Sequence, residues 1–243
     1  MPTPKAGYRD AEGNTLPGVT TILKQVDIQF LIGIANKMGL KGRETYGPKG
    51  EWERAADIGT CAHARIEAFI KGATLTPAQW CLSWTEVDLS ASVVPGDVQK
   101  VAAAMDLFSA STPAYESFLK WADGREFKGR TEVGLVHSQG FGGTIDYLPE
   151  EEIFDWKTSR QLGASAVAQV CGGYGMLCEE NLFVPRLYHV VRFPKEGGEA
   201  EQWTIRADSP TATAGRVMFM SLLESYKATA QIEAVNKIRM KKS

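Results

Sequence analysis

The sequence of 243 residues carries little net charge, only four cysteines and no long apolar run. Its formal charge of −2 at pH 7 points to neither nucleic acid nor a membrane surface as a partner, although a local basic groove would not show in that total. The chain lacks a stretch of roughly 20 apolar residues and a basic-then-apolar leader. These absences predict a cytoplasmic protein without a membrane partner. The cysteines form no C-x-x-C pair, which argues against zinc sites and disulfides.

What the sequence does contain is the patterning of one α/β domain. Its hydrophobic fraction of 44% supports a sizeable core. Residues 1–125 are predicted to be mainly helical. The elements expected there are a hairpin at 7–16, helices at 17–23, 28–38, 52–70, 96–109 and 114–122, and irregular segments at 41–50 and 73–95.

Residues 126–208 alternate like strands and are predicted to form the sheet core. The elements expected there are strands at 131–136, 144–148 and 152–157, a helix at 163–180, and strands at 186–193 and 201–206. This order predicts an α/β fold in which a mixed β-sheet is flanked by helices, with an N-terminal helical elaboration, rather than an alternating doubly wound fold.

Residues 209–243 combine a long helix, expected at 209–233, with a basic tail. Five basic residues stand against the single acidic Glu233 in the last stretch: Lys227, Lys237, Arg239, Lys241 and Lys242. This excess is typical of a solvated helix end, and it is also consistent with a tail that contacts phosphates.

Two aspartates and a lysine stand out in the predicted strands. Asp146 lies within a strand, where a charge is costly unless something binds it. Asp155 closes the next strand and Lys157 lies two positions beyond it, so both side chains point to one side, with Trp156 opposite. Either these groups share one patch, or Asp155 and Lys157 form only a surface ion pair on an edge strand.

A shared patch of this kind suits phosphodiester hydrolysis. Converging carboxylates favour a hard cation such as Mg²⁺, which prefers oxygen ligands. A lysine beside such a cation could hold or activate a water molecule, or neutralise charge that develops on a phosphate.

The surrounding segments resemble a known family. Segment 143–146 (GTID) followed by 155–159 (DWKTS) resembles the G-x-(I/V)-D … D-(Y/W)-K-T-(S/T) core of PD-(D/E)XK nucleases, in the branch of RecB nuclease domains and phage-type exonucleases. Segment 16–23 (LPGVTTIL) resembles the opening of its phage members, and segment 59–67 (GTCAHARIE) resembles its G-x-x-x-H-x-x-(I/L)-E helix. Glu132 resembles the glutamate of its first core strand.

The resemblance implies a restriction-endonuclease-like fold with a catalytic Lys157 and a bound Mg²⁺, for which Mn²⁺ could substitute. The metal ligands that it implies are Asp146, Asp155, the backbone carbonyl of Trp156, His63 and Glu132. His63 would reach the metal or the scissile phosphate from its helix. Taken alone, His63 is typical of a structural residue at the edge of an apolar stripe, Glu132 of a solvated charge, and Glu67 of a partner for a base.

The sequence departs from the family in two respects. The branch usually carries Gln-x-x-x-Tyr for contact with DNA, whereas Gln169 and Tyr174 are five apart, about 140° around an ideal helix. Tyr174 also falls on an apolar stripe typical of core packing, although Gly172 and Gly173 could distort the helix enough to align the pair. Some relatives hold an iron–sulfur cluster on four cysteines. The spacing here does not match, so no cluster is predicted on Cys61, Cys81, Cys171 and Cys178.

The prediction is therefore a metal-dependent DNA exonuclease that serves recombination or replication, located in the host cytoplasm if it is phage-encoded. Its expected partners are duplex DNA ends and a single-strand annealing or other recombination protein, and an oligomer is compatible with the resemblance. Three alternatives stay open: an endonuclease on the same scaffold, a non-catalytic DNA-binding protein that kept the fold, and a phosphodiesterase acting on RNA or small nucleotides.

Overall fold

The computed structural model describes most of the chain, namely residues 7–26, 50–89 and 94–240. The helix predicted at 28–38, and the loop predicted at 41–50 apart from Gly50, lie outside these residues. None of the helices in the described ranges has the length and apolar character needed to span a bilayer.

The N-terminal elements agree with the sequence pattern. The predicted hairpin is present as two short antiparallel strands, β1 (Tyr8–Arg9) and β2 (Thr15–Leu16). The turn between them is closed by the Asp10 carboxylate, which accepts a hydrogen bond of 2.6 Å from the backbone N–H of Asn14. Residues 19–26 then form a helix close to the one predicted at 17–23.

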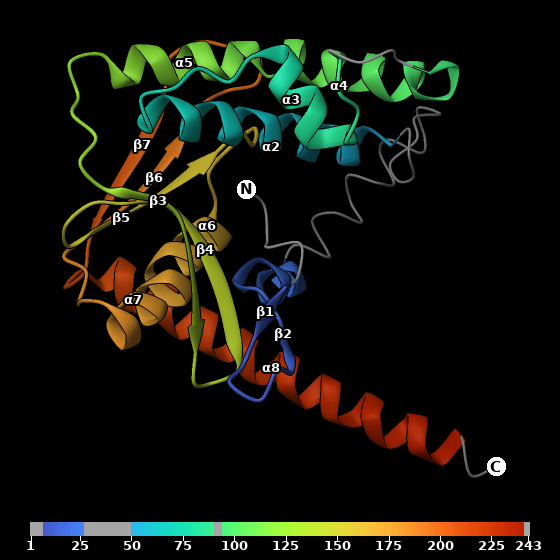
Figure 1. Ribbon diagram of the computed structural model, residues 1–243. Coiled ribbons are helices and arrows are strands. Elements are labelled where there is room, and N and C mark those ends of the chain that lie inside the picture. The colour runs from blue at the N-terminus through green and yellow to red at the C-terminus, as the bar shows by residue number, and fades with distance from the viewer. Residues whose placement is uncertain (1–6, 27–49, 90–93, 241–243) are drawn as a thin grey trace, which may run out of the picture.

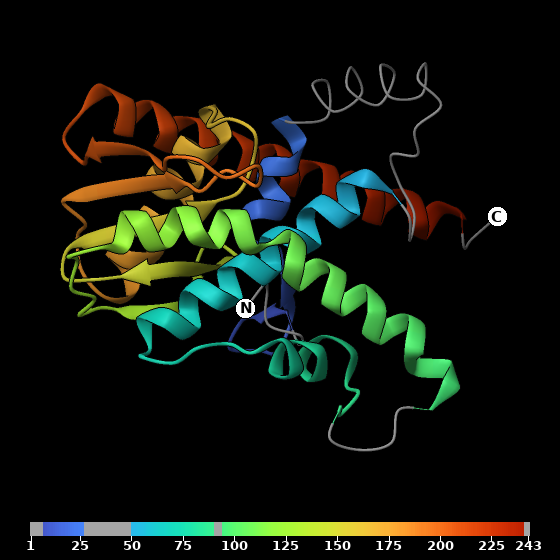
Figure 2. The same ribbon diagram turned by 90° about the horizontal axis from the view of Figure 1, so that it is seen from above.

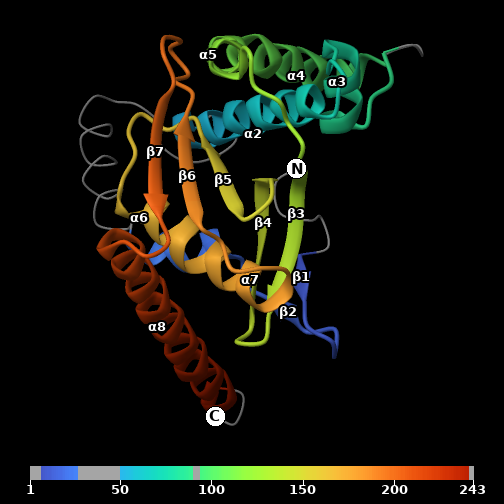
Figure 3. The ribbon, with the colours of Figure 1, turned by 90° about the vertical axis from the view of Figure 1, so that its left-hand side faces the viewer.

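One five-stranded sheet forms the centre of the molecule (Figure 3). Its strands, in spatial order, are β3 (Arg130–His137), β4 (Phe141–Leu148), β5 (Glu152–Lys157), β6 (Leu187–Arg192) and β7 (Glu201–Arg206). Neighbours run antiparallel except β5 and β6, which are parallel. The predicted α/β fold with a mixed sheet flanked by helices is therefore confirmed, and each strand lies within a few residues of its predicted range.

Helices from the N-terminal half cover one face of the sheet (Figures 1 and 2). The first layer is α2 (Glu51–Ile70) together with α5 (Thr112–Ala122). Their apolar side chains pack on aromatic residues of β4 and β5, on Val191 of β6 and on Phe193 just after it. Farther out, α3 (Pro77–Thr85) and α4 (Val98–Ala110), the latter preceded by the 3₁₀ turn Pro95–Asp97, pack against α2 through a separate apolar cluster. That cluster contains Cys61 and Cys81.

The opposite face is covered by helices from the C-terminal half. They are α6 (Ala164–Val167), the π-helical segment Ala168–Tyr174, α7 (Gly175–Asn181) and α8 (Pro210–Met240). The largest apolar cluster lies between these helices and the sheet, and it contains Cys171 and Cys178. Figure 1 shows the C-terminal part of α8 extending away from the sheet. There Lys227 pairs with Glu224 at 2.7 Å, and a phosphate contact by the tail stays a prediction.

The prediction of an irregular segment at 73–95 was wrong in part, because α3 lies within it. Thr76 and Gln79 form a capping box, in which each side chain accepts a hydrogen bond from the backbone N–H of the other residue, and Pro77 occupies the first helical position. Nine residues are too few to leave a clear helical periodicity. The capping residues were therefore the signal in the sequence that could have indicated α3.

Candidate active site

The candidate site lies where β4 and β5 separate. The two strands are paired at Tyr147 and Phe154, and continuing that register by one residue would place Asp146 opposite Asp155. Instead, the backbone N–H of Trp156 donates a hydrogen bond of 2.6 Å to Oδ2 of Asp146. The Asp146 carboxylate thus takes the place of a ladder carbonyl, and this charge-assisted hydrogen bond helps to keep it buried.

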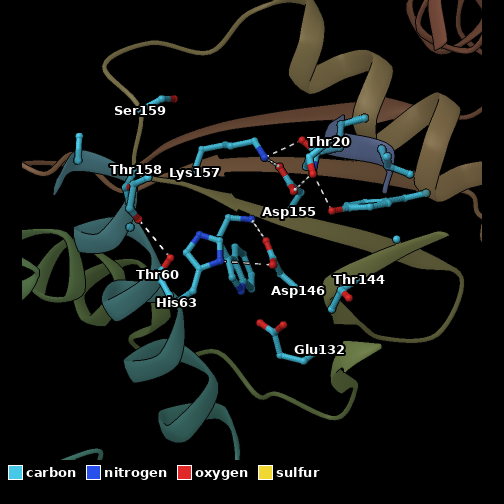
Figure 4. A pocket seen from close by; sticks show the side chains of 18 of the residues that line it. Thr20, Thr60, His63, Glu132, Thr144, Asp146, Asp155, Lys157, Thr158 and Ser159 are labelled. Carbon is cyan, nitrogen blue, oxygen red and sulfur yellow. Dashed lines mark hydrogen bonds and ion pairs between the residues drawn. The ribbon is translucent and has the colours of Figure 1, made fainter. Parts of the chain in front are cut away.

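A cleft of about 510 Å³ opens at this point, between α2, the end of β5 and the π-helical segment. Every residue for which a site role was predicted lines it: His63, Glu132, Asp146, Asp155, Trp156, Lys157, Gln169 and Tyr174. Figure 4 shows the carboxylates of Glu132, Asp146 and Asp155 and the ring of His63 directed toward the same space. Glu67 is not among the lining residues, and it pairs with Lys71 at 2.5 Å.

Lys157 is held beside the second aspartate rather than on an exposed edge. Its Nζ lies 2.6 Å from Oδ2 of Asp155 and donates a hydrogen bond of 2.8 Å to Oε1 of Gln169. The Gln169 amide in turn donates to Oδ1 of Asp155 at 3.0 Å. The simple surface ion pair on an edge strand is therefore wrong, because β5 lies inside the sheet and the Asp155 side chain is only 2% exposed.

A π-helical segment brings Gln169 and Tyr174 together. The Gln169 amide donates a hydrogen bond of 2.7 Å to the Tyr174 hydroxyl, although five residues on an ideal α-helix would place the two far apart around its axis. The wider turn over Ala168–Tyr174 corrects that expectation. Both side chains are buried, at 5% and 4% exposure. Gln169 contacts Asp155 and Lys157 directly, and Tyr174 contacts Gln169. A contact of either side chain with DNA stays a prediction.

Two glycines let this segment pack closely on its neighbours. A Cβ on Gly172 would lie 2.4 Å from Cβ of Phe219 on α8, and one on Gly173 would lie 2.5 Å from Cγ1 of Val19. Real Cβ atoms do not come so close to other heavy atoms, so only glycine fits without movement of the helix or its neighbours. Val19 belongs to the segment 16–23 that resembles the phage opening motif, and its structural role here is to pack against the π-helical segment.

We expect Gly173→Ala to lower the free energy of unfolding by about 1–3 kcal/mol, because the added methyl group overpacks the contact with Val19. Chemical denaturation measures the change. In a Val19→Ala background the same substitution should cost clearly less, since the clashing methyl groups are gone. Gly163→Ala, which adds a methyl group with no heavy atom within 4 Å, is the matched control. A loss of equal size in both backgrounds would contradict this account.

His63 and Glu132 complete a possible metal-binding group with Asp146. Nδ1 of His63 on α2 lies 3.3 Å from Oδ1 of Asp146. Glu132 stands opposite Asp146 in the β3–β4 register, between the flanking pairs of that ladder. One ligand atom from each of the three residues lies within 4.8 Å of the other two. Like charges opposite each other destabilise a sheet, so a cation between these carboxylates would relieve that repulsion.

The backbone at Glu132 is unusual for its residue type. Its φ of 51° lies in the left-handed region, which costs free energy for a residue with a side chain and is found most often at functional sites. The flanking pairs Thr131–Tyr147 and Val133–Ile145 keep the same register. The distortion is therefore confined to the one residue whose carboxylate approaches Asp146.

Burial and mutual repulsion disturb the carboxyl groups of the cleft. Burial, followed by the Asp146 charge, raises the pKa of Glu132 to about 7. Burial also raises the pKa of Asp155 to about 6, against the lowering effect of Lys157. For Asp146 burial acts in the same direction, but His63, Lys157 and the hydrogen bond from the Trp156 N–H together outweigh it, and the pKa falls. The charged forms of Glu132 and Asp155 are thus under-stabilised by the protein alone, and a bound cation would favour them.

The pKa of His63 responds to the same neighbours. Burial would lower it, but the Asp146 carboxylate and the Glu132 charge together outweigh burial, and the pKa of His63 is raised. His63 therefore holds its proton more firmly than a free imidazole while Asp146 is charged and no cation lies between them. A metal ion would have to displace that proton, so metal affinity should fall at acidic pH.

Four polar residues of the cleft were given no site role from the sequence, although Thr158 and Ser159 belong to the segment 155–159 that resembles the nuclease core. They are Thr60, Thr158, Ser159 and Lys195, and all of them line the wall beside Lys157. Thr60 lies on α2 next to Gly59, where an added Cβ would lie 2.8 Å from Oγ1 of Thr158. The close approach that Gly59 allows brings these hydroxyls to one place, which no local pattern in the sequence could indicate.

A comparison of the chain with models of protein families finds no match, and a comparison with curated proteins finds no significant one. The functional assignment therefore depends on the geometry and chemistry of the cleft.

Proposed function

We propose that the protein is a metal-dependent DNA exonuclease of the PD-(D/E)XK type, with a restriction-endonuclease-like fold. The observation that carries the proposal is the meeting of Asp146, Asp155 and Lys157 in one cleft of a mixed sheet flanked by helices. The segments around these three residues are those that resemble the nuclease core.

The side chains of the cleft fit a divalent cation. Asp146, Glu132 and His63 offer two carboxylate oxygens and one imidazole nitrogen within reach of a single ion. Oδ2 of Asp155 is buried, and its partner among the described residues is the Lys157 ammonium at 2.6 Å. This oxygen therefore keeps a lone pair for a further ligand.

The backbone carbonyl of Trp156 is one more candidate ligand for the cation. The N–H and the carbonyl of a strand residue point to the same side of the strand, and the Trp156 N–H points to Asp146. Its carbonyl oxygen is thus directed toward the same gap between β4 and β5. A set dominated by oxygen, with one imidazole, suits Mg²⁺ and Mn²⁺.

The residues of the cleft have separate roles in the proposed reaction. A divalent ion bound there would polarise a phosphodiester and lower the pKa of a water molecule. Lys157, fixed by Asp155 and Gln169, directs its charge at the position where negative charge develops on the phosphate. Because these partners already hold the ammonium in place, little reorganisation is needed during the reaction.

The imidazole ligand predicts a preference among metals. We expect the wild-type protein to bind Mn²⁺ at least about tenfold more tightly than Mg²⁺, because nitrogen ligands favour the transition metal. His63→Ala should bring the two dissociation constants, measured by calorimetry, closer together. His137→Ala changes a histidine that pairs with Glu180 and does not line the cleft, and it should leave their ratio as it is. An unchanged ratio in His63→Ala would remove this residue from the ligand set.

Linear and closed circular duplex DNA, each incubated with Mg²⁺, Mn²⁺ or EDTA, test the activity itself. We expect progressive loss of linear DNA with either metal, intact circles and no reaction in EDTA. Nicked circles would indicate an endonuclease. Degradation of an RNA strand in place of DNA would indicate a different phosphodiesterase, and binding without cleavage would indicate a DNA-binding protein that kept the fold.

A further inference from the structure

Lys195 is a half-buried cation of the cleft with no assigned role. It lies three residues after β6, and its Nζ donates a hydrogen bond to the carbonyl of Ala55 in α2. Among the residues that the structure describes, no carboxylate forms an ion pair with it. Burial lowers the pKa of Lys195, against a smaller opposite effect of the exposed Glu196. An ammonium group buried without a counterion is costly, and an anionic ligand would relieve that cost.

The parallel pairing of β5 with β6 brings Lys195 to the same end of the cleft as Thr158 and Ser159. The backbone N–H of Phe193 donates a hydrogen bond of 2.7 Å to the carbonyl of Lys157. The chain that leaves β6 toward Lys195 therefore runs next to the chain that leaves β5 toward Thr158 and Ser159, and all three residues line the cleft. Ligands of open α/β sheets bind beyond the carboxyl ends of the strands.

The two walls of the cleft differ in charge. Figure 4 shows Thr60, Thr158 and Ser159 on one side of Lys157, and Asp155 and Asp146 on the other. The acidic wall suits a cation. On the hydroxyl-lined wall, Thr60 donates to the carbonyl of Ala56 and Ser159 donates to that of Gln161. The Thr158 hydroxyl, which has no hydrogen-bond partner among the described residues, and the Lys195 ammonium are therefore the groups that can donate to a phosphate there.

We infer that Lys195, with the hydroxyl of Thr158, binds the phosphate next to the scissile one on a nucleic-acid strand. The inference rests on the proposed function and narrows its substrate to a polynucleotide, because a single nucleotide has no second phosphodiester to occupy this wall. Lys195 acts through binding and has no part in the chemical step.

The test combines charge removal on the protein with charge removal on the DNA. Lys195→Gln keeps a donor for the Ala55 carbonyl but loses the charge, Lys195→Arg keeps the charge, and Lys120→Gln makes the same change at an exposed residue of α5. Each protein is assayed on a linear duplex that carries one neutral methylphosphonate, scanned through the positions beside the scissile bond, with Mn²⁺.

We expect the methylphosphonate at one neighbouring position to lower kcat/KM of the wild type about tenfold, the size of one charge-assisted hydrogen bond. On unmodified DNA, kcat/KM of Lys195→Gln should be about tenfold below that of the wild type. A methylphosphonate at the sensitive position should lower kcat/KM of this variant almost no further. Lys195→Arg should lose less than Lys195→Gln on unmodified DNA, and Lys120→Gln should respond to the methylphosphonate as the wild type does.

Equal methylphosphonate losses in the wild type and Lys195→Gln would overturn the inference. If Lys195→Gln fails to fold, the wild type alone decides the question. A methylphosphonate scan of the wild type that finds no sensitive position beside the scissile bond would also overturn the inference. Absence of wild-type cleavage on unmodified DNA would count against the proposed function instead. In that case the same series, measured as dissociation constants with Ca²⁺ in place of Mn²⁺, decides whether Lys195 recognises the phosphate.

Discussion

Lys157→Ala should lower the rate of DNA cleavage at least about a thousandfold, because it removes a positive charge fixed beside the reacting phosphate. Its ammonium group is held by Asp155 at 2.6 Å and by Gln169 at 2.8 Å. The loss should appear in kcat measured with saturating DNA and Mn²⁺. DNA affinity should change only a few-fold, since one phosphate contact among many is lost.

The partners of Lys157 make the control informative. Lys157→Arg keeps the charge, but its planar guanidinium cannot reproduce the geometry of an ammonium between a carboxylate and an amide. We expect it to retain DNA affinity with little activity. Lys120→Ala, a lysine of the exposed face of α5, should cleave like the wild type. Wild-type turnover in Lys157→Ala would show that another cation, with Lys195 the first candidate, serves the chemical step.

The sequence was sufficient for the parts of the site that depend on local periodicity. Side chains of a strand alternate, so the common side of Asp155 and Lys157, and the opposite side of Trp156, followed directly from the spacing. The structure confirms both, with Trp156 in the apolar cluster under α2 and α5 and the charged pair facing Gln169.

Contacts between distant segments were beyond the sequence. The alignment of Gln169 with Tyr174 depends on a π-helical segment, and that segment packs against Phe219 and Val19 through its two glycines. Pattern reasoning assumes a regular helix and cannot tell which glycine marks a widened turn. Lys195 was missed for a similar reason, since its place in the cleft follows from the pairing of β5 with β6 and from the approach of α2.

The site combines groups that the protein alone does not fully compensate. On one wall, Glu132 and Asp155 are carboxyl groups whose pKa values are raised to about 7 and about 6. On the other wall, Lys195 is a half-buried ammonium group with a carbonyl for a partner. A cation and a phosphate bound together would satisfy both walls, whereas either one alone leaves the other wall uncompensated. Metal and DNA are therefore expected to bind cooperatively.

The metal-free protein should lose thermal stability as pH rises from 5 to 7.5, by at least about 5 °C in Tm. The pKa of Glu132 is about 7 in the folded state, against an ordinary value of 4.5, and that of Asp155 is about 6, against an ordinary value of 3.8. At a pH between the ordinary pKa of each group and its pKa in the folded protein, the folded state binds more protons than the unfolded chain. Unfolding free energy therefore falls as pH rises through the window. The raised pKa of His63 acts in the same direction, whereas the lowered pKa values of His137 and His189 act in the opposite direction and offset part of the change.

A bound cation should reverse this trend, because it takes the place of the protons on Glu132 and Asp155. Scanning calorimetry in EDTA and in Mn²⁺, at pH 5 and 7.5, should show a larger increase in Tm with metal at the higher pH. Glu132→Gln provides the matched control, since all other groups still titrate while the carboxyl group facing Asp146 is gone. Its metal-free Tm should depend less on pH, and Mn²⁺ should stabilise it less. Metal stabilisation that is no larger at pH 7.5 than at pH 5 would show that these carboxyl groups do not form the cation site.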